Sequence, residues 1–194
     1  MIMRIMMSGL VDGDRKVLAG APHGRKVFGR MMENTSQEPD TAEPAFLDFS
    51  GVEVATASFL RETVLAFRDA VRRRRSNLYP VVANASSVIV DELAVLTAAD
   101  NDVVVTCLLD DNKEPREPRI IGELDPKQRI TFDLVRKRGE TDAAELLREH
   151  GDDEESRVTQ TAWNNRLSSL ASRGLVVELS QGRSKRYRPL FQER

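Results

Sequence analysis

Residues 46–60 constrain the fold more than any other stretch of the chain. Residues 46–49 are almost continuously apolar around Asp48, as expected of a strand that is covered on both faces. Ser50-Gly51 predicts a tight turn after this strand, and a helix is expected to begin near Ser58. The apolar residues of that helix recur at the spacing of a single stripe: Leu60, Val64, Phe67 and Val71. A buried strand followed by an amphipathic helix is the repeating unit of an α/β fold.

The segments on either side extend this alternation. Before the central strand we expect a hairpin of residues 2–11 and 15–19 around Asp12-Gly13, a short helix over 24–32 and a loop over 33–44. After it, the pattern predicts strands over 79–84, 103–109 and 119–121, with a helix over 87–99. Residues 1–122 are therefore predicted to form an α/β sheet with crossover helices.

Composition points to a globular protein. Of the 194 residues, 40% are hydrophobic and 31% are charged, which are ordinary values for a globular chain. No apolar run approaches the roughly 20 residues of a membrane-spanning helix, so no membrane partner is expected. The apolar start is short and soon meets Asp12, which argues against a signal peptide. We therefore expect a cytoplasmic protein.

Side chains that support catalysis or metal binding are sparse. Cys107 is the single cysteine, which excludes an internal disulfide, and His23 and His150 are the only imidazoles. No cysteine-histidine spacing of a zinc site and no phosphate-binding glycine loop occurs in the sequence. Asp48 at a strand end is expected to be structural. The sequence thus predicts no enzyme, no metal site and no cofactor.

A second domain, over residues 123–194, is predicted where the strand-helix alternation stops. Asp125-Pro126 has the form of a helix start. Helices are expected over 126–138, over 142–150 with Thr141 as the cap, and over about 157–173. Residues 175–179 and 185–190 then predict two strands around a turn at Gln181-Gly182.

The third of these helices has an apolar side and a side of short polar groups. At about 100° per residue, Trp163, Leu167 and Leu170 cluster together. The nearly opposite side, flanked by Arg157 and Asn164, carries hydrogen-bonding side chains: Thr161, Asn165, Ser168 and Ser172. Asn can form two hydrogen bonds to adenine, and Thr or Ser can reach base edges or phosphates. A merely solvated helix more often carries Glu and Lys, so this side favours contact with the major groove of DNA.

The turn between the last two strands is cationic. It holds four cations and no acid: Arg183, Lys185, Arg186 and Arg188. At a hairpin tip such cations can follow a phosphate backbone or enter the minor groove. The alternative is a charged edge that prevents strand-to-strand aggregation. Together with the polar helix side, the turn favours DNA contact.

Nearby acids limit the expected affinity. Residues 125–194 hold 14 Lys and Arg against 12 Asp and Glu, a net charge of +2, whereas residues 1–124 hold 15 against 19 and carry −4. Residues 152–155 are all acidic and precede the third helix, so DNA would repel them while the helix N-terminus would attract them. Since one such module makes few contacts, modest affinity and binding as a homodimer are expected.

Residues 126–190 resemble the winged helix-turn-helix domains of bacterial transcription regulators. The resemblance is carried by residues 161–170, which include Trp163, followed by Arg173-Gly174-Leu175-Val176. This pattern is typical of a third helix that leads into the first strand of the wing. The resemblance implies double-stranded DNA as the partner.

Residues of about 15–122 resemble the STAS-like domains, relatives of the anti-sigma-factor antagonists. The resemblance rests on Leu47-Asp48-Phe49-Ser50-Gly51-Val52 followed by Ala57-Ser58-Phe59-Leu60. In the antagonists the matching loop reads Asp-Ser-Ser-Gly, and a partner kinase phosphorylates the second serine. Here the acid and the glycine are missing. Ser58 and its neighbour Thr56 are candidates for phosphorylation, although Ser58 as a plain helix cap is favoured.

Two hypotheses follow. In the first, the chain is a DNA-binding transcriptional regulator in which the STAS-like domain senses a signal or docks a protein. Residues expected to approach bases are Arg157, Thr161, Asn164, Asn165 and Ser168, and those expected to hold phosphates are Arg183, Lys185, Arg186 and Arg188. In the second, both domains bind proteins, such as a regulatory protein or a kinase, without binding DNA. Salt-sensitive DNA affinity distinguishes the two.

Overall fold

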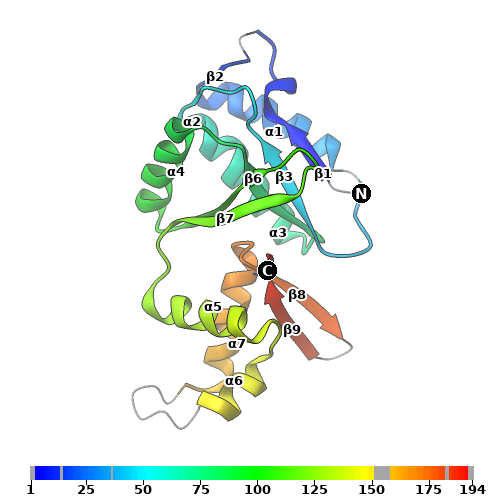
Figure 1. Cartoon of the computed structure of the whole chain (residues 1–194), viewed down its shortest axis with the longest axis vertical. Coiled ribbons are helices and arrows are strands. Elements are labelled where there is room, and N and C mark those ends of the chain that lie inside the picture. The colour runs from blue at the N-terminus through cyan, green and yellow to red at the C-terminus, as the bar shows by residue number, and fades with distance from the viewer. Residues whose placement is uncertain (1–2, 14, 36, 151–157, 182–183, 192–194) are drawn as a thin grey trace. The chain divides into compact units, whose positions relative to one another are not determined.

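A computed structural model of the chain describes residues 3–13, 15–35, 37–150, 158–181 and 184–191 (Figure 1). The chain divides into two compact units, unit 1 (Met1–Glu123) and unit 2 (Leu124–Arg194). Within the described ranges, no helix has the length and apolar character needed to cross a membrane. The two units differ in architecture.

Unit 1 is a mixed α/β fold built on a five-stranded sheet. Four strands run parallel in the order β1-β3-β5-β6, and β7 pairs antiparallel with β6 at one edge. The strands are β1 (Met3–Met6), β3 (Glu43–Asp48), β5 (Leu78–Ala83), β6 (Val103–Leu109) and β7 (Pro115–Gly122). The predicted α/β class is confirmed, because consecutive parallel strands are linked through helices.

Three helical segments pack on one face of this sheet (Figure 1). They are α1 (Ala21–Asn34), the continuous run of α2 (Ala57–Leu60), η2 (Arg61–Leu65) and α3 (Ala66–Arg73), and α4 (Ser87–Asp100). Their inward side chains join a single hydrophobic cluster with residues of the sheet: Ile5, Leu47, Phe49, Val82 and Val104. The expected stripe from Leu60 to Val71 is buried in this cluster. Removing this apolar surface from water is the main stabilising contribution in unit 1.

The predicted N-terminal hairpin is wrong. Strand β1 pairs in parallel with β3, while β2 (Val17–Leu18) pairs in parallel with β4 (Val54–Ala55). An Asp-Gly pair favours a reversal of the chain but does not determine which strands become neighbours. The long apolar strand β3 offers β1 a partner inside the sheet, so the pairing follows burial and not proximity in the sequence.

Helix α2 begins at Ala57, and its cap is Thr56, not Ser58 as predicted. Thr56 Oγ1 accepts hydrogen bonds from Phe59 N at 3.4 Å and from Gly20 N at 3.2 Å. Ser58 lies in the first helical turn, half-buried, with its Oγ 3.2 Å from Thr56 Oγ1. Thr56 follows β4 directly, so its backbone is extended, with ψ 153°, as an N-cap requires. The cap therefore depends on the pairing of β2 with β4.

The described residues of unit 2 form three helices and a two-stranded antiparallel ribbon. The elements are α5 (Pro126–Arg138), α6 (Ala143–His150), α7 (Gln160–Ser172), β8 (Val176–Gln181) and β9 (Ser184–Pro189). Their number, type and order are as predicted. Helix α7 begins later than the expected residue 157, with Thr159 as its cap, whose Oγ1 accepts from Ala162 N at 3.2 Å.

Thr141 lies between α5 and α6 and forms an isolated antiparallel β-bridge with Tyr187 of the ribbon. Its backbone N and O exchange hydrogen bonds with Tyr187 of β9, at 2.9 Å and 2.7 Å. The predicted Thr141 cap is wrong because this residue is engaged by β9. Asp142 caps α6 instead, and its Oδ1 accepts from the backbone N of Ala144 and of Glu145 at 2.8 Å each.

Candidate functional site

Helix α7 separates its residues into a buried and an exposed side, as its sequence predicts. Trp163, Leu167 and Leu170 are at most 2% exposed and anchor the helix in the core of unit 2. The predicted contact residues on the other side are all exposed: Thr161, Asn164, Asn165 and Ser168. The helix therefore presents amide and hydroxyl groups outward on a fixed support.

This exposed side forms one wall of a groove of about 540 Å³ within unit 2, here called the α7–β9 groove. Helix α7 contributes Gln160, Asn164, Asn165 and Ser168. The facing walls come from β9, through Lys185 and Tyr187, and from the start of α6, through its cap Asp142 and through Ala143 and Ala144. The groove brings together four of the predicted contact residues, Lys185 among them.

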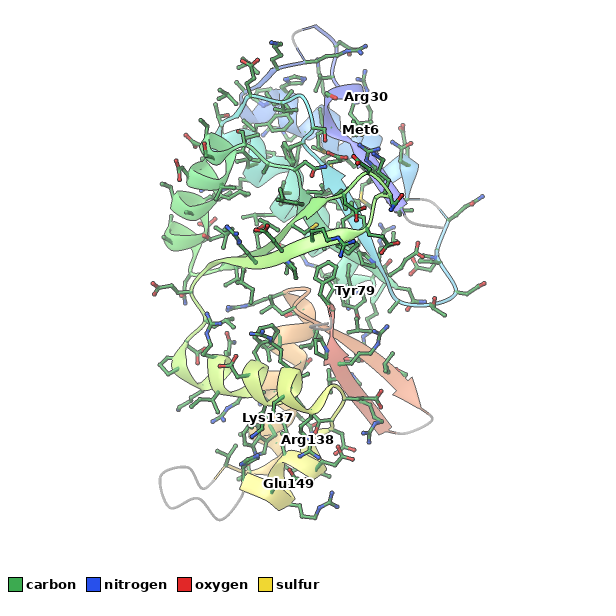
Figure 2. All side chains as sticks on the ribbon, in the orientation of Figure 1. Met6, Arg30, Tyr79, Lys137, Arg138 and Glu149 are labelled. Atoms are coloured by element: carbon green, nitrogen blue, oxygen red, sulfur yellow. The ribbon has the colours of Figure 1, made fainter. Side chains whose placement is uncertain are left out.

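The walls of the groove are tied to each other by hydrogen bonds. The backbone bridge between Thr141 and Tyr187 fixes β9 beside the start of α6. Tyr187 is buried, and its hydroxyl lies 3.4 Å from Glu178 Oε2 on β8. Arg138 at the end of α5 pairs with Glu149 on α6, and Figure 2 shows both side chains between the two helices. The groove is thus preformed.

Cations of the ribbon fall on two different faces. Side chains alternate along a strand, so Lys185 faces the groove with Tyr187 while Arg186 and Arg188 face the other way. Lys185 Nζ lies 2.8 Å from Glu178 Oε1, and the lysine side chain is 42% exposed. Arg183 lies outside the described residues, as does Arg157 before α7.

Arg186 is bound by carboxylates. Its guanidinium pairs with Glu140, with Asp142 at 3.3 Å and with Glu145 at 3.1 Å. The guanidinium of Arg186 donates hydrogen bonds to Glu140 and Glu145, and these bonds raise the pKa of Arg186 and lower the pKa of Glu145. Arg186 and these acids, here called the Arg186 clamp, hold β9 against α6, so this cation is not directed at the groove.

A second polar cluster lies in unit 1, at the carboxyl end of β3. Asp48 is fully buried; Ser50 donates to its Oδ1 from N at 2.8 Å and from Oγ at 2.7 Å, and Asn84 Nδ2 donates at 3.0 Å. Arg4 pairs with the other carboxylate oxygen. Burial raises the pKa of Asp48, but the hydrogen bonds outweigh it and the pKa is lowered. Each carboxylate oxygen is satisfied, which fits the expected structural role.

The neighbouring Cys107 is buried, as predicted for a small apolar side chain. Burial raises the pKa of its thiol to about 12, and the charge of Asp48 adds to the effect. A thiol with such a pKa stays protonated at neutral pH and is a poor nucleophile.

The sequence did not predict the groove residues Gln160 and Tyr187, or those at the start of α6. Asp142, Ala143 and Ala144 carry no local signal for a contact surface, since they read simply as a helix start. They reach the groove because Thr141, which precedes them, bonds to Tyr187 of β9. The Arg186–Glu140 pair joins the same two segments, which lie 46 positions apart in the sequence.

Comparisons with known proteins add no relative. No family model matches the chain, and no match was found among curated proteins or among solved structures. A functional assignment therefore depends on the geometry of this chain alone.

Proposed function

We propose that the chain is a DNA-binding transcriptional regulator. The observation that carries the proposal is the α7–β9 groove, in which Asn164, Asn165 and Ser168 stand beside Lys185. Amide and hydroxyl groups on one exposed helix side complement the base edges of the major groove. A lysine at the margin of that surface complements a phosphate, which holds the protein in register.

The connectivity of unit 2 supports a winged helix-turn-helix domain. Helix α5, the bridging position Thr141, helices α6 and α7, and the β8–β9 ribbon follow one another in the order of that class. In helix-turn-helix proteins the second helix of the motif enters the major groove. That role falls to α7, whose apolar side is fixed by Trp163 and Leu167.

The residues take different roles in this proposal. Thr161, Asn164, Asn165 and Ser168 approach bases, and Lys185 holds a phosphate. Arg186 positions β9 through its carboxylate contacts in place of the phosphate contact expected from the sequence. Arg157, Arg183 and Arg188 remain proposed backbone contacts. Since a single small domain buries little DNA surface, binding as a homodimer is proposed.

For residues 1–122 we propose a STAS-like role in sensing a signal or docking a protein. Ser58 is the better phosphorylation candidate of the two, because Thr56 Oγ1 is occupied by hydrogen bonds from Phe59 N and Gly20 N. A partner kinase would then act on the first turn of α2. Mass spectrometry of the chain from its native cells tests this, and a quantitatively unmodified Ser58 would count against it.

The groove is tested by fluorescence anisotropy of the full chain with duplex fragments of the host genome. Asn165→Ala should weaken binding of the selected site about tenfold, as expected for the loss of a bidentate base contact. Lys185→Ala should weaken binding to all duplexes and lower the slope of log affinity against log salt by about one. Arg148→Ala removes an exposed cation of α6 that does not line the groove, so it serves as the matched control.

The outcome separates the two hypotheses. Equal DNA affinity in the parent, Asn165→Ala and Lys185→Ala proteins would show that the groove does not contact DNA. The absence of any salt-sensitive DNA binding, together with a protein retained by the full chain through the same groove residues, would favour a protein-interaction switch.

A further inference from the structure

Unit 1 contains a smaller cavity, of about 240 Å³, between α4 and the β6–β7 hairpin. Its interior is mainly apolar and is lined by Ala85, Val90, Leu108 and Ile121. The other lining residues are Thr106 and the buried Cys107 of β6 and two charged residues of β7, Glu117 and Arg119. Every lining residue belongs to unit 1, so the cavity is separate from the α7–β9 groove.

The cavity exists because α4 and the hairpin separate along their length. At one end Gly122 lies so close to α4 that an added Cβ would be 3.0 Å from Thr97 Cβ. Toward the other end the register of β6 shifts between Thr106 and Leu108, and such a bulge bends the strand. Val90, on the first half of α4, is left only half-buried.

The floor of the cavity is held in place by Asn84. Its backbone N donates to Cys107 O at 3.1 Å, and its Oδ1 accepts from Leu109 N at 2.9 Å. The same side chain donates to Asp48, which links the bulged strand end to the buried polar cluster. The cavity is therefore preformed, so a ligand need not order its walls.

Opposite charges stand at the rim. Arg119 Nη2 lies 2.6 Å from Glu117 Oε2, and the two side chains are 71% and 60% exposed. An exposed pair of this kind contributes little, so a ligand that carries both charges can replace it at small cost. Glu117 has φ 48°, a backbone conformation unfavourable for a non-glycine residue, and such strain is concentrated at functional positions.

Size and charge together restrict the ligand. The cavity is smaller than the roughly 300–1,000 Å³ of pockets for drug-sized molecules, so it suits a ligand of few non-hydrogen atoms. Glu117 disfavours a simple anion and Arg119 disfavours a simple cation, whereas a zwitterion satisfies both. Leu108, which is 48% exposed, presents an apolar surface inside the same site.

We infer that this cavity binds a free amino acid with an aliphatic side chain. The carboxylate of the ligand pairs with Arg119, its ammonium pairs with Glu117, and its side chain packs against Val90, Leu108 and Ile121. This binding site goes beyond the proposed DNA-binding function and does not depend on it, because no residue of unit 2 takes part.

Isothermal titration of the full chain with L-leucine tests the inference. Saturable binding is expected, with about tenfold or greater weakening for 4-methylpentanoate, which lacks the ammonium, and for 3-methylbutylamine, which lacks the carboxylate. Glycine, which lacks the aliphatic group, should give no saturable heat. Valine and isoleucine extend the series to shorter and β-branched side chains.

Variants locate the binding. Arg119→Gln and Glu117→Gln should each weaken leucine binding about tenfold, and Val90→Phe should abolish it by filling the interior. Arg116→Gln is the matched control, since its guanidinium pairs with Asp110 and does not line the cavity. Thermal unfolding confirms that each variant is folded, and the two rim substitutions are at exposed positions that the fold tolerates.

Three results would overturn the inference. They are no saturable heat with leucine, valine or isoleucine, unchanged leucine affinity in both rim variants, and binding of 4-methylpentanoate as tight as that of leucine. The titration contains no DNA, so any of these results leaves the groove proposal standing.

Discussion

Unit 1 and unit 2 use charged side chains in opposite ways. In unit 1 Asp48 is fully buried at the end of a central strand, and Ser50, Asn84 and Arg4 satisfy its carboxylate. In unit 2 the Arg186 clamp lies near the surface, with Arg186 25% exposed and Glu145 23% exposed. A buried carboxylate without its partners is costly, whereas a partly exposed ion pair is screened by water and salt.

The difference separates a buried cluster of hydrogen bonds from a partly exposed cluster of ion pairs. The Asp48 cluster connects β1, β3 and β5 and so stabilises the sheet on which the rest of unit 1 is built. The Arg186 clamp consists of individually weak contacts that orient β9 and leave Lys185 at the α7–β9 groove. We therefore expect substitutions in buried positions to alter stability and substitutions in the clamp to alter mainly the groove.

The largest effect is expected from the core of unit 2. Leu167→Ala should lower the free energy of unfolding by about 3–4 kcal/mol, because Leu167 is fully buried and the deletion leaves a cavity. Trp163 is the single tryptophan of the chain, so urea unfolding followed by its fluorescence reports on unit 2. Ile130→Ala on α5, where the side chain is 57% exposed, should change the free energy of unfolding by less than about 0.5 kcal/mol. Equal effects of the two substitutions would contradict the orientation of α7.

Asp48→Ala should destabilise unit 1 by about 2–3 kcal/mol, because donors of Ser50 and Asn84 lose their buried acceptor. The urea transition followed by far-UV circular dichroism should move to lower concentration, while the Trp163 transition keeps its midpoint. Asp91→Ala, at an exposed position of α4, is the control. A shift of the Trp163 transition by the same amount would mean that the two units unfold together. Asp48 would then not stabilise unit 1 separately from unit 2.

The contribution of Asp48 should also depend on pH in a defined direction. Its folded-state pKa lies below the ordinary value of 3.8, since the hydrogen bonds from Ser50, Asn84 and Arg4 outweigh the effect of burial. Its ionised form therefore stabilises the fold above that value, and the contribution is lost as the pH falls through the folded-state pKa. The stability difference between the parent and Asp48→Asn should be full at about pH 7 and smaller at about pH 3. A difference that grows on acidification would contradict the assigned hydrogen bonds.

The smallest effect on stability is expected from the Arg186 clamp. Arg186→Gln should cost about 1 kcal/mol at low salt and less at high salt, because its pairs are partly exposed. DNA affinity should fall without a change in the salt slope, unlike the result for Lys185→Ala. Arg148→Gln is the control on α6. A reduced salt slope for Arg186→Gln would show that Arg186 contacts phosphate, and the Arg186 clamp would then belong to the DNA interface.

Local patterns in the sequence determine much of this protein. The strand Val103–Leu109 and the helix Pro126–Arg138 have the bounds expected from their residues, because an apolar β-branched run and an Asp-Pro helix start are signals carried by adjacent positions. The buried and exposed sides of α7 follow from helical periodicity in the same way. The polar wall that α7 contributes to the candidate groove could therefore be predicted from the sequence.

Tertiary structure alone decided which segments meet. Parallel pairing of β1 with β3, the cap at Thr56 and the engagement of Thr141 by β9 all depend on hydrogen bonds between residues far apart in the chain. Lys185 and Arg186 also depend on the tertiary structure. The sequence predicts the same phosphate contact for both, but side chains alternate along β9, so Lys185 lines the groove and Arg186 pairs with Glu145. Local propensity selects a conformation for each segment, but the partner of a strand or a charge is chosen by what the whole fold buries beside it.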